Sequence, residues 1–159
     1  MHLDVEPHLI GSTQQNWQAY SELVVHAGQK MHAAGYKIEW DIPFWLEQWS
    51  VTYNGSSTGL LSVLANNADT MCLMDYRDTA ATILSMAAEE LPLGNKCKII
   101  LGVETYSVEA NYVSFREEGK AAMYSALNTV MSSLAGNSSL THGYGCAIHH
   151  VDTWMSLGS

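Results

Sequence analysis

The feature that most constrains the fold of this sequence is the repeated order of a short apolar segment followed by a longer segment with helical periodicity. Chains ordered in this way build parallel sheets whose strands are joined by crossover helices. The segment 97–104 is a nearly unbroken apolar run, as expected of a strand that is covered on both faces. We therefore expect five strand–helix units in one α/β domain over 1–159, with strands at 2–7, 37–42, 70–74, 97–104 and 143–150.

The segments between these strands carry apolar stripes with helical spacing. Ser12 or Thr13 is placed to cap the first helix, and Asp78 or Thr79 the third. Ser114 with Glu117 predicts a capping box at the fourth helix. A polar loop is expected at 54–57. The positions expected to face the core are Trp17, Tyr20, Val24, Ala27, Met31, Leu60, Leu61, Leu64, Ala80, Ile83, Leu84, Ala87, Leu91, Met123, Leu127, Val130 and Leu134.

Length and charge exclude several classes of protein. A chain of 159 residues with 47% hydrophobic content buries one substantial core. The formal net charge of -9 repels nucleic-acid phosphates and anionic lipid headgroups, and no apolar run reaches the roughly 20 residues of a membrane span. We expect neither nucleic acid nor membrane as a partner. Cys72, Cys97 and Cys146 form no CxxC pair, and no secretory signal is present, so a cytoplasmic location is expected.

Ionisable side chains stand at the carboxyl end of each predicted strand. Ligand sites in parallel α/β sheets and barrels collect at this edge. We therefore predict a shared polar cleft there. The alternative is that the charges are helix caps and solvated loop residues, which suits Asp78 and Asp152. The candidate residues are Asp4, Glu6, Asp41, Asp75, Tyr76, Arg77, Glu104, Tyr106, His149 and His150.

Aromatic residues gather near the same strand ends, with Trp45 and Trp154 as further candidates for the cleft. Flat rings beside carboxylates suit sugars, because C–H groups stack on the rings while hydroxyl groups bond to the acids. Ordinary packing beneath loops explains the aromatic residues equally well. The aromatic pattern thus supports a carbohydrate ligand without deciding for it.

Five motifs carry a resemblance to a known family. The segments HLDVEP, WDIPFW, LMDYRDTA, IILGVETY and AIHHVDTW resemble the C-terminal part of an uncharacterised bacterial TIM-barrel family related to glycoside hydrolases. The resemblance covers almost the whole chain and implies that its strands correspond to strands four to eight of a barrel. The expected fold is therefore a partial (β/α) barrel that lacks the first three units. Val151 and Thr153 stand where the family pattern has Tyr and Ser.

The resemblance also implies a pair of catalytic residues. Retaining glycosidases of this fold place an acid/base Glu after strand four and a nucleophilic Glu at the end of strand seven, and these places correspond to Glu6 and Glu104. The chemistry requires two carboxyl groups about 5–5.5 Å apart. Val5 precedes Glu6 where the superfamily often has Asn. If the chain is an enzyme, the expected activity is that of a glycosidase.

A divalent metal ion is a second interpretation of the same residues. His149 and His150 with Asp4, Glu6, Asp41 and Glu104 have the ligand chemistry that zinc, manganese or iron accepts. Adjacent strand residues point to opposite faces, so only one of the two histidines should face the cleft. No HExxH or GxGxxG motif is present. We therefore assign no metal ligand and expect no cofactor.

The absence of three barrel units predicts self-association. Five strands do not close a barrel that typically needs about 250 residues, and open strand edges with an apolar face favour association. We expect a homo-oligomer, most simply a dimer. The alternative is a truncated gene product whose site is a relic. Three functions therefore stay open, namely a glycosidase-type hydrolase, a non-catalytic sugar or metal-binding module, and a self-associating structural protein.

Overall fold

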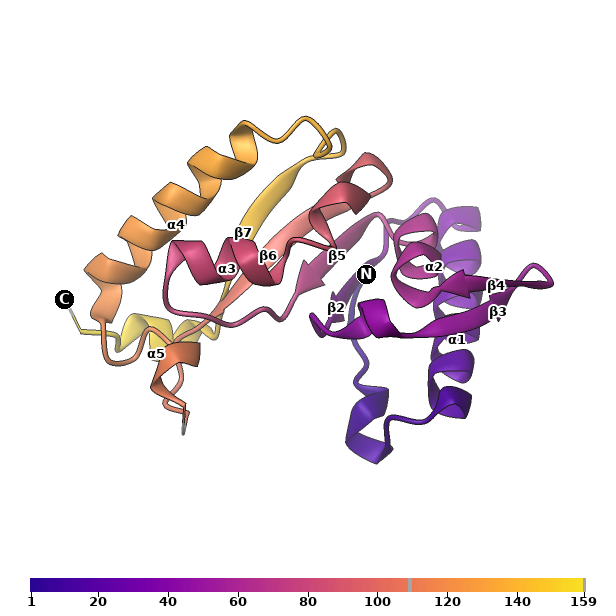
Figure 1. The fold of residues 1–159 in the computed structure, drawn as a ribbon, viewed down its shortest axis with the longest axis horizontal. Helices are drawn as coiled ribbons and strands as arrows, with labels where there is room; N and C mark the ends of the chain where they lie inside the picture. The colour runs from indigo at the N-terminus through magenta and orange to yellow at the C-terminus, as the bar shows by residue number, and fades with distance from the viewer. Residues whose placement is uncertain (109, 159) are drawn as a thin grey trace.

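The centre of the molecule is a five-stranded, wholly parallel sheet (Figure 1). The computed structural model describes residues 1–108 and 110–158. Within them the strand order is β1-β2-β5-β6-β7, and β1 and β7 are the two edges, so the sheet is not closed into a barrel. The strands are β1 (His2–Asp4), β2 (Glu39–Ile42), β5 (Thr70–Leu73), β6 (Lys98–Glu104) and β7 (Tyr144–His149).

The strands follow one another across the sheet in the order of the chain. Crossovers between parallel strands are right-handed, so connections that all step in the same direction lie on the same face of the sheet. The connecting helices are α1 (Gln14–Ala33), α2 (Leu60–Asn67), α3 (Ala80–Met86) and α4 (Gly119–Ala135), followed by α5 (Val151–Met155). Short 3₁₀ turns, η1 to η4, cover Pro7–Ile10, Leu46–Gln48, Leu91–Asn95 and Asn111–Val113.

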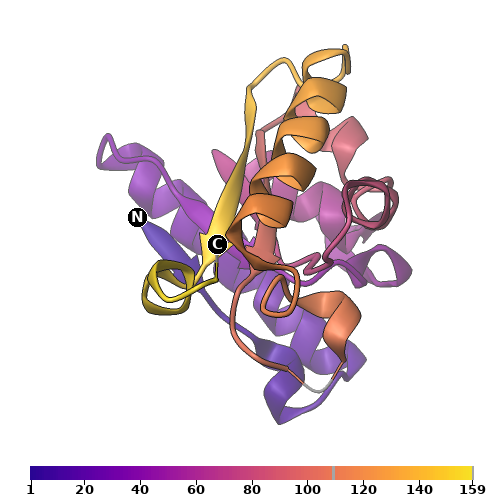
Figure 2. The same cartoon turned by 90° about the vertical axis from the view of Figure 1, so that its left-hand side faces the viewer.

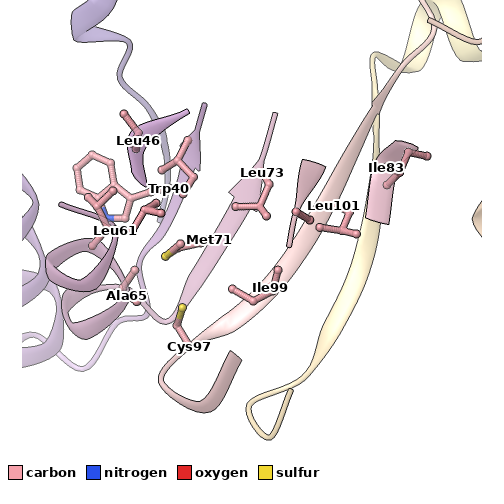
Figure 3. Packing of buried hydrophobic residues seen from close by; sticks show 14 of the residues in the cluster. Trp40, Leu46, Leu61, Ala65, Met71, Leu73, Ile83, Cys97, Ile99 and Leu101 are labelled. Atoms are coloured by element: carbon pink, nitrogen blue, oxygen red, sulfur yellow. The ribbon is translucent and has the colours of Figure 1, made fainter. Parts of the chain in front are cut away.

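The hydrophobic core lies between the sheet and these helices. Side chains alternate between the two faces of a strand, and Ile99, Leu101 and Val103 of β6 are fully buried on the helix side. Met71 and Leu73 of β5 lie in the same layer (Figure 3). This face therefore holds the fold together and leaves the opposite face to the polar residues.

The predicted first helix is confirmed. One capping residue explains where it begins, and a stripe of buried residues explains how it packs. The Thr13 hydroxyl accepts a hydrogen bond from the N–H of Asn16 at 3.1 Å and caps α1. Trp17, Tyr20 and Val24 are buried along one side of the helix. Gly28 continues this stripe where α1 meets α2, since a Cβ there would lie 2.5 Å from the carbonyl oxygen of Asn67.

Two local predictions are wrong. The expected loop at 54–57 is part of a hairpin formed by β3 (Ser50–Tyr53) and β4 (Ser56–Gly59), and the positive φ angles of Asn54 and Gly55 make its two-residue turn. The expected capping box at Ser114 and Glu117 does not form. The Ser114 hydroxyl instead accepts from the N–H of Arg116, and α4 begins only at Gly119.

The carboxyl end of β7 leads directly into α5. Figure 2 shows α4 running alongside β7 and α5 lying at the end of the strand. In the part of the chain that is described, no helix combines the length and the apolar character needed to cross a membrane.

Candidate functional site

The candidate site lies on the face of the sheet opposite the core, here called the open face. A cavity of about 190 Å³ lies on it. Asp41 is level with Cys72 in the strand register, and Gly102 is level with Ala147, so residues distant in sequence meet by alternation alone. The cavity is lined by His2, Asp41, Cys72, Tyr76, Gly102, Ala147, Ile148 and His149.

Glu104 is the most constrained acid of the site. It is the last residue of β6 and is 6% exposed. One carboxylate oxygen, Oε1, accepts the backbone N–H groups of Thr105 and Tyr106, each at 2.7 Å. The other, Oε2, lies 2.8 Å from Nδ1 of His149, which is its register partner on β7. The carboxylate is thus held in one orientation with both oxygens engaged.

His150 lies close to His149, although adjacent strand residues should point to opposite faces. Their ring centroids are 4.3 Å apart. Of the two, His149 lines the cavity, and His150 lies beside it because β7 ends at His149 and His150 is already the N-cap of α5. Nδ1 of His150 lies 2.7 Å from the Asp152 carboxylate, and the Tyr106 ring lies 5.7 Å from the imidazole.

Tyr76 covers this group from the side of β5. Its ring is stacked on His149, with centroids 5.7 Å apart and planes 13° apart. Gly102 makes room for it, since a Cβ at that position would lie 3.0 Å from the Tyr76 ring and 2.8 Å from the Leu73 carbonyl oxygen. Burial, followed by the charges of carboxylates that include Glu104, raises the pKa of Tyr76, so its hydroxyl stays protonated and able to donate.

The opposite wall of the cavity comes from β1, β2 and β5. Nε2 of His2 lies 2.6 Å from the Asp41 carboxylate, and Nδ1 lies 3.6 Å from Glu39. The hydrogen bond to Asp41 raises the pKa of His2 above its usual value. Burial and the neighbouring carboxylate of Asp41 raise the pKa of the Cys72 thiol, which therefore stays protonated. This wall thus offers a hydrogen-bonded His–Asp pair and a neutral thiol.

Sequence reasoning missed two contributors to this wall. Neither His2 nor Cys72 is among the candidate site residues that the sequence predicts. The signal was present in the alternation of strand residues: His2 lies two positions before Asp4, and Cys72 lies level with Asp41 on the neighbouring strand.

The other predicted site residues lie apart from this cavity or at its edge. Asp4 ends β1, level with Asp41. The Glu6 carboxylate lies 3.5 Å from His8, and Trp45 packs edge-on against Trp17 at 5.4 Å. The Arg77 guanidinium lies over the rings of Phe44 and Tyr112, and the Trp154 indole donates to the Tyr124 hydroxyl at 3.0 Å.

The separation of β1 and β6 bears on the predicted catalytic pair. Two strands stand between them, which corresponds to about 14 Å along the sheet. Glu6 follows the end of β1 and interacts with His8, whereas Glu104 interacts with His149. Glu104 thus shares its surroundings with His149, His150, Tyr76 and Tyr106, and the contact of Glu6 is with His8.

Asp75 belongs to a different environment. Asp75 is fully buried, and so is Glu90. Within the described residues, the carboxyl group of neither residue has a hydrogen-bond partner. Burial raises the pKa of Asp75 to about 7. The positive charge of Arg77 lowers this pKa, and the negative charge of Glu47 raises it further. Burial and then the charge of Asp75 raise the pKa of Glu90 to about 8. Asp75 is therefore a neutral buried acid over much of the acidic range.

Searches against protein-family models, curated proteins and solved structures found no match to this chain.

Proposed function

We propose that the open face binds a small polyhydroxylated molecule, such as one sugar ring, without cleaving it. The observation that carries this proposal is the cavity of about 190 Å³ with the hydrogen-bonded His2–Asp41 pair on one side and the Tyr76–His149 stack on the other. Pockets for drug-sized ligands span about 300–1,000 Å³. The smaller volume therefore suits a ligand of about one ring.

The lining residues match the chemistry of a sugar. The carboxylate of Asp41 accepts hydrogen bonds, and the protonated Tyr76 hydroxyl donates them. Gly102 and Ala147 leave an apolar strip between the polar groups, where the C–H face of a ring can lie. Since Asp41, Glu39 and Asp4 make this face acidic, neutral and amino sugars should bind better than sugar acids.

Binding is favoured over hydrolysis by the contacts of the predicted catalytic pair. A nucleophilic carboxylate needs a free oxygen aimed at the sugar, whereas both oxygens of Glu104 accept hydrogen bonds or contact His149. Glu6 interacts with His8 at the far side of two strands. Glycoside hydrolysis by Glu6 and Glu104 is therefore the second candidate, supported by the motif resemblance.

A titration followed by two-dimensional NMR tests the binding proposal. Glucose, N-acetylglucosamine, glucosamine and glucuronate are added in turn, and we expect saturable shifts at residues of the open face with the neutral or amino sugars. Tyr76→Leu and Asp41→Asn should each weaken binding at least tenfold. Tyr36→Leu is the matched control, because Tyr36 is exposed outside the cavity.

Two results would contradict the proposal. The first is the absence of saturable shifts with every sugar at millimolar concentration. The second is equal affinity in the Tyr76→Leu variant and its control. Release of the aryl group from aryl glycosides, abolished in Glu104→Gln, would instead support the hydrolase.

We further infer that the sheet is part of a (β/α) barrel and that the chain self-associates. The consecutive strand order and the clustering of polar residues at strand ends support the first point. Exposed apolar residues in η1 and α1, the elements that follow β1, support the second, among them Leu9, Ile10 and Leu23. A second copy of the chain that covers this edge would bury both the strand and the apolar surface.

A further inference from the structure

We propose that Glu104, His149 and His150 bind a divalent transition-metal ion, Zn²⁺ in the first place, at the carboxyl ends of β6 and β7. Each residue offers one ligand atom, and the three atoms lie within 4.8 Å of one another. Among the His, Cys, Asp and Glu side chains of the described residues, these three form the group whose ligand atoms all come this close together. The inference does not rest on sugar binding.

The spacing of the ligand atoms suits an ion. Zinc binds imidazole nitrogen and carboxylate oxygen at about 2.0–2.2 Å in tetrahedral geometry, which places two neighbouring ligand atoms about 3.3–3.6 Å apart. Oε2 of Glu104 and Nδ1 of His149 are already 2.8 Å apart. An outward shift of each atom by a few tenths of an ångström would let both atoms bind one ion in place of their hydrogen bond.

The surroundings of Glu104 aim its second carboxylate oxygen, Oε2, at this position. Oε1 accepts two backbone N–H groups, from Thr105 and Tyr106. This interaction fixes the carboxylate plane and leaves Oε2 as the atom that faces the histidines. A ligand held in this way loses little side-chain entropy on binding, which favours affinity.

The contact between His150 and Asp152 is a second, independent observation. Metal-binding histidines commonly donate their other ring N–H to a carboxylate, which fixes the tautomer and the ring orientation. Nδ1 of His150 lies 2.7 Å from Oδ1 of Asp152, and the Thr153 hydroxyl lies 3.2 Å away. With Nδ1 donating to the carboxylate, Nε2 is the atom left to bind the ion.

The ligand set indicates the class of ion. Two imidazoles and one carboxylate suit zinc, iron or copper rather than magnesium or calcium, which prefer oxygen ligands. Three protein ligands leave a coordination position open. The His149 and His150 side chains are 54% and 39% exposed, so solvent or a ligand reaches that position. His149 also lines the cavity of the open face, which places the ion at its rim.

A structural role for the same residues is the competing explanation. The hydroxyl groups of Thr105 and Thr153 lie 2.7 Å apart and join the end of β6 to α5 without any ion. In that case the Glu104–His149 pair would only add to this connection. The two explanations differ in whether the loss of an exposed histidine changes the affinity for metal.

Isothermal titration of metal-free protein with Zn²⁺, in the absence of any sugar, tests the proposal. We expect one equivalent of Zn²⁺ bound per chain, with affinity at least 100-fold above that for Mg²⁺. His149→Gln and His150→Gln should each lower the Zn²⁺ affinity at least 100-fold. Asp152→Asn, which alters only the group that orients His150, should lower it about 10- to 100-fold.

His32→Gln provides the matched control. His32 forms a comparable pair with Asp69, at 2.8 Å, but is not in the three-residue group. The control should keep the native Zn²⁺ affinity. His149 and His150 are partly exposed, so their variants should fold, and circular dichroism checks this. Equal affinity in the native protein, His150→Gln and His32→Gln would overturn the proposal, as would the absence of any stoichiometric binding.

Discussion

Asp75 and Glu90 are the two residues whose environment most opposes their usual charge. Both are fully buried, and their pKa values are raised to about 7 and about 8. An unfolded chain releases these protons near pH 4. Between about pH 4 and pH 8 the native state therefore binds more protons than the unfolded state, and the free energy of unfolding falls as the pH rises.

This proton linkage predicts the behaviour of Asp75→Asn. The amide carries no charge at any pH, so its stability relative to the native protein should improve as the pH is raised from 5 to 9. Between pH 5 and pH 9, the free energy of unfolding of the variant relative to that of the native protein should rise by on the order of 2 kcal/mol. Urea denaturation at several pH values measures it. Glu117→Gln is the control at an exposed position, and its free energy of unfolding should differ from that of the native protein by the same amount at every pH. A pH-independent difference for Asp75→Asn would contradict the prediction.

Gly102 controls the position of Tyr76. In Gly102→Ala the new Cβ would lie 2.8 Å from a backbone oxygen of β5 and 3.0 Å from the Tyr76 ring, so strand and ring must move apart. We expect a loss of about 1–3 kcal/mol in stability and altered ring signals of His149 in NMR spectra.

Gly145→Ala is the matched control for Gly102. It adds the same methyl group to the neighbouring strand, but there the Cβ meets only the flexible end of Ile100 at 3.0 Å. Equal effects of the two substitutions on stability and on the His149 signals would show that Gly102 has no special role.

At the scale of elements, the five strands and the long helices were predictable because each carries a complete periodic pattern. The segment 97–104 alternates between the helix face and the open face, and Trp17, Tyr20 and Val24 repeat with the helical period. The hairpin after β2 was missed because the polar turn at Asn54 and Gly55 was interpreted without its short flanking strands. Such short, half-exposed strands carry little apolar signal.

The candidate site was predicted in part, for a related reason. The rule that functional residues gather at the carboxyl ends of parallel strands correctly placed Asp41, Tyr76 and His149 around one cavity. The rule does not say in which direction a side chain beyond a strand end will point. Trp45 and Trp154 pack in other layers, and His150 turns toward His149 because α5 begins there. These outcomes depend on loop geometry, which sequence periodicity does not encode.

A substitution at the contact between α1 and α2 distinguishes the effect of steric fit on stability from the effect of helix propensity. Alanine stabilises a helix interior by about 1 kcal/mol relative to glycine, so propensity alone predicts a gain for Gly28→Ala. A Cβ at Gly28 would instead meet the Asn67 carbonyl oxygen at 2.5 Å and force α2 outward. We expect a net loss of about 1–3 kcal/mol in urea denaturation.

Gly136→Ala at the end of α4 is the control for this contact, because its Cβ meets only the Ser133 carbonyl at an ordinary 3.6 Å. This substitution should leave the stability unchanged or raise it. Stabilisation by Gly28→Ala would show that the two helices are less closely packed than the structure indicates.

At the scale of the whole molecule, the two edges of the sheet differ. β7 leads into α5 and has α4 alongside it (Figure 2). The segment that follows β1 lines, together with α1, an apolar groove of about 200 Å³. The groove is lined by Val5, Pro7, Ile10, Asn16, Ala19, Tyr20 and Leu23. A second copy seated in this groove would remove its apolar surface from water.

Charge opposes this association and offers a way to test it. Each copy carries a formal charge of -9, so two copies repel each other, and added salt screens that repulsion. Sedimentation at micromolar concentration should reveal a dimer that strengthens between 20 and 500 mM salt, and Ile10→Glu should weaken it at least tenfold. Met155→Glu adds the same charge at an exposed position on α5 and should have the smaller effect. A well-folded monomer at every salt concentration would show that the edge at β1 is stable in water without a partner.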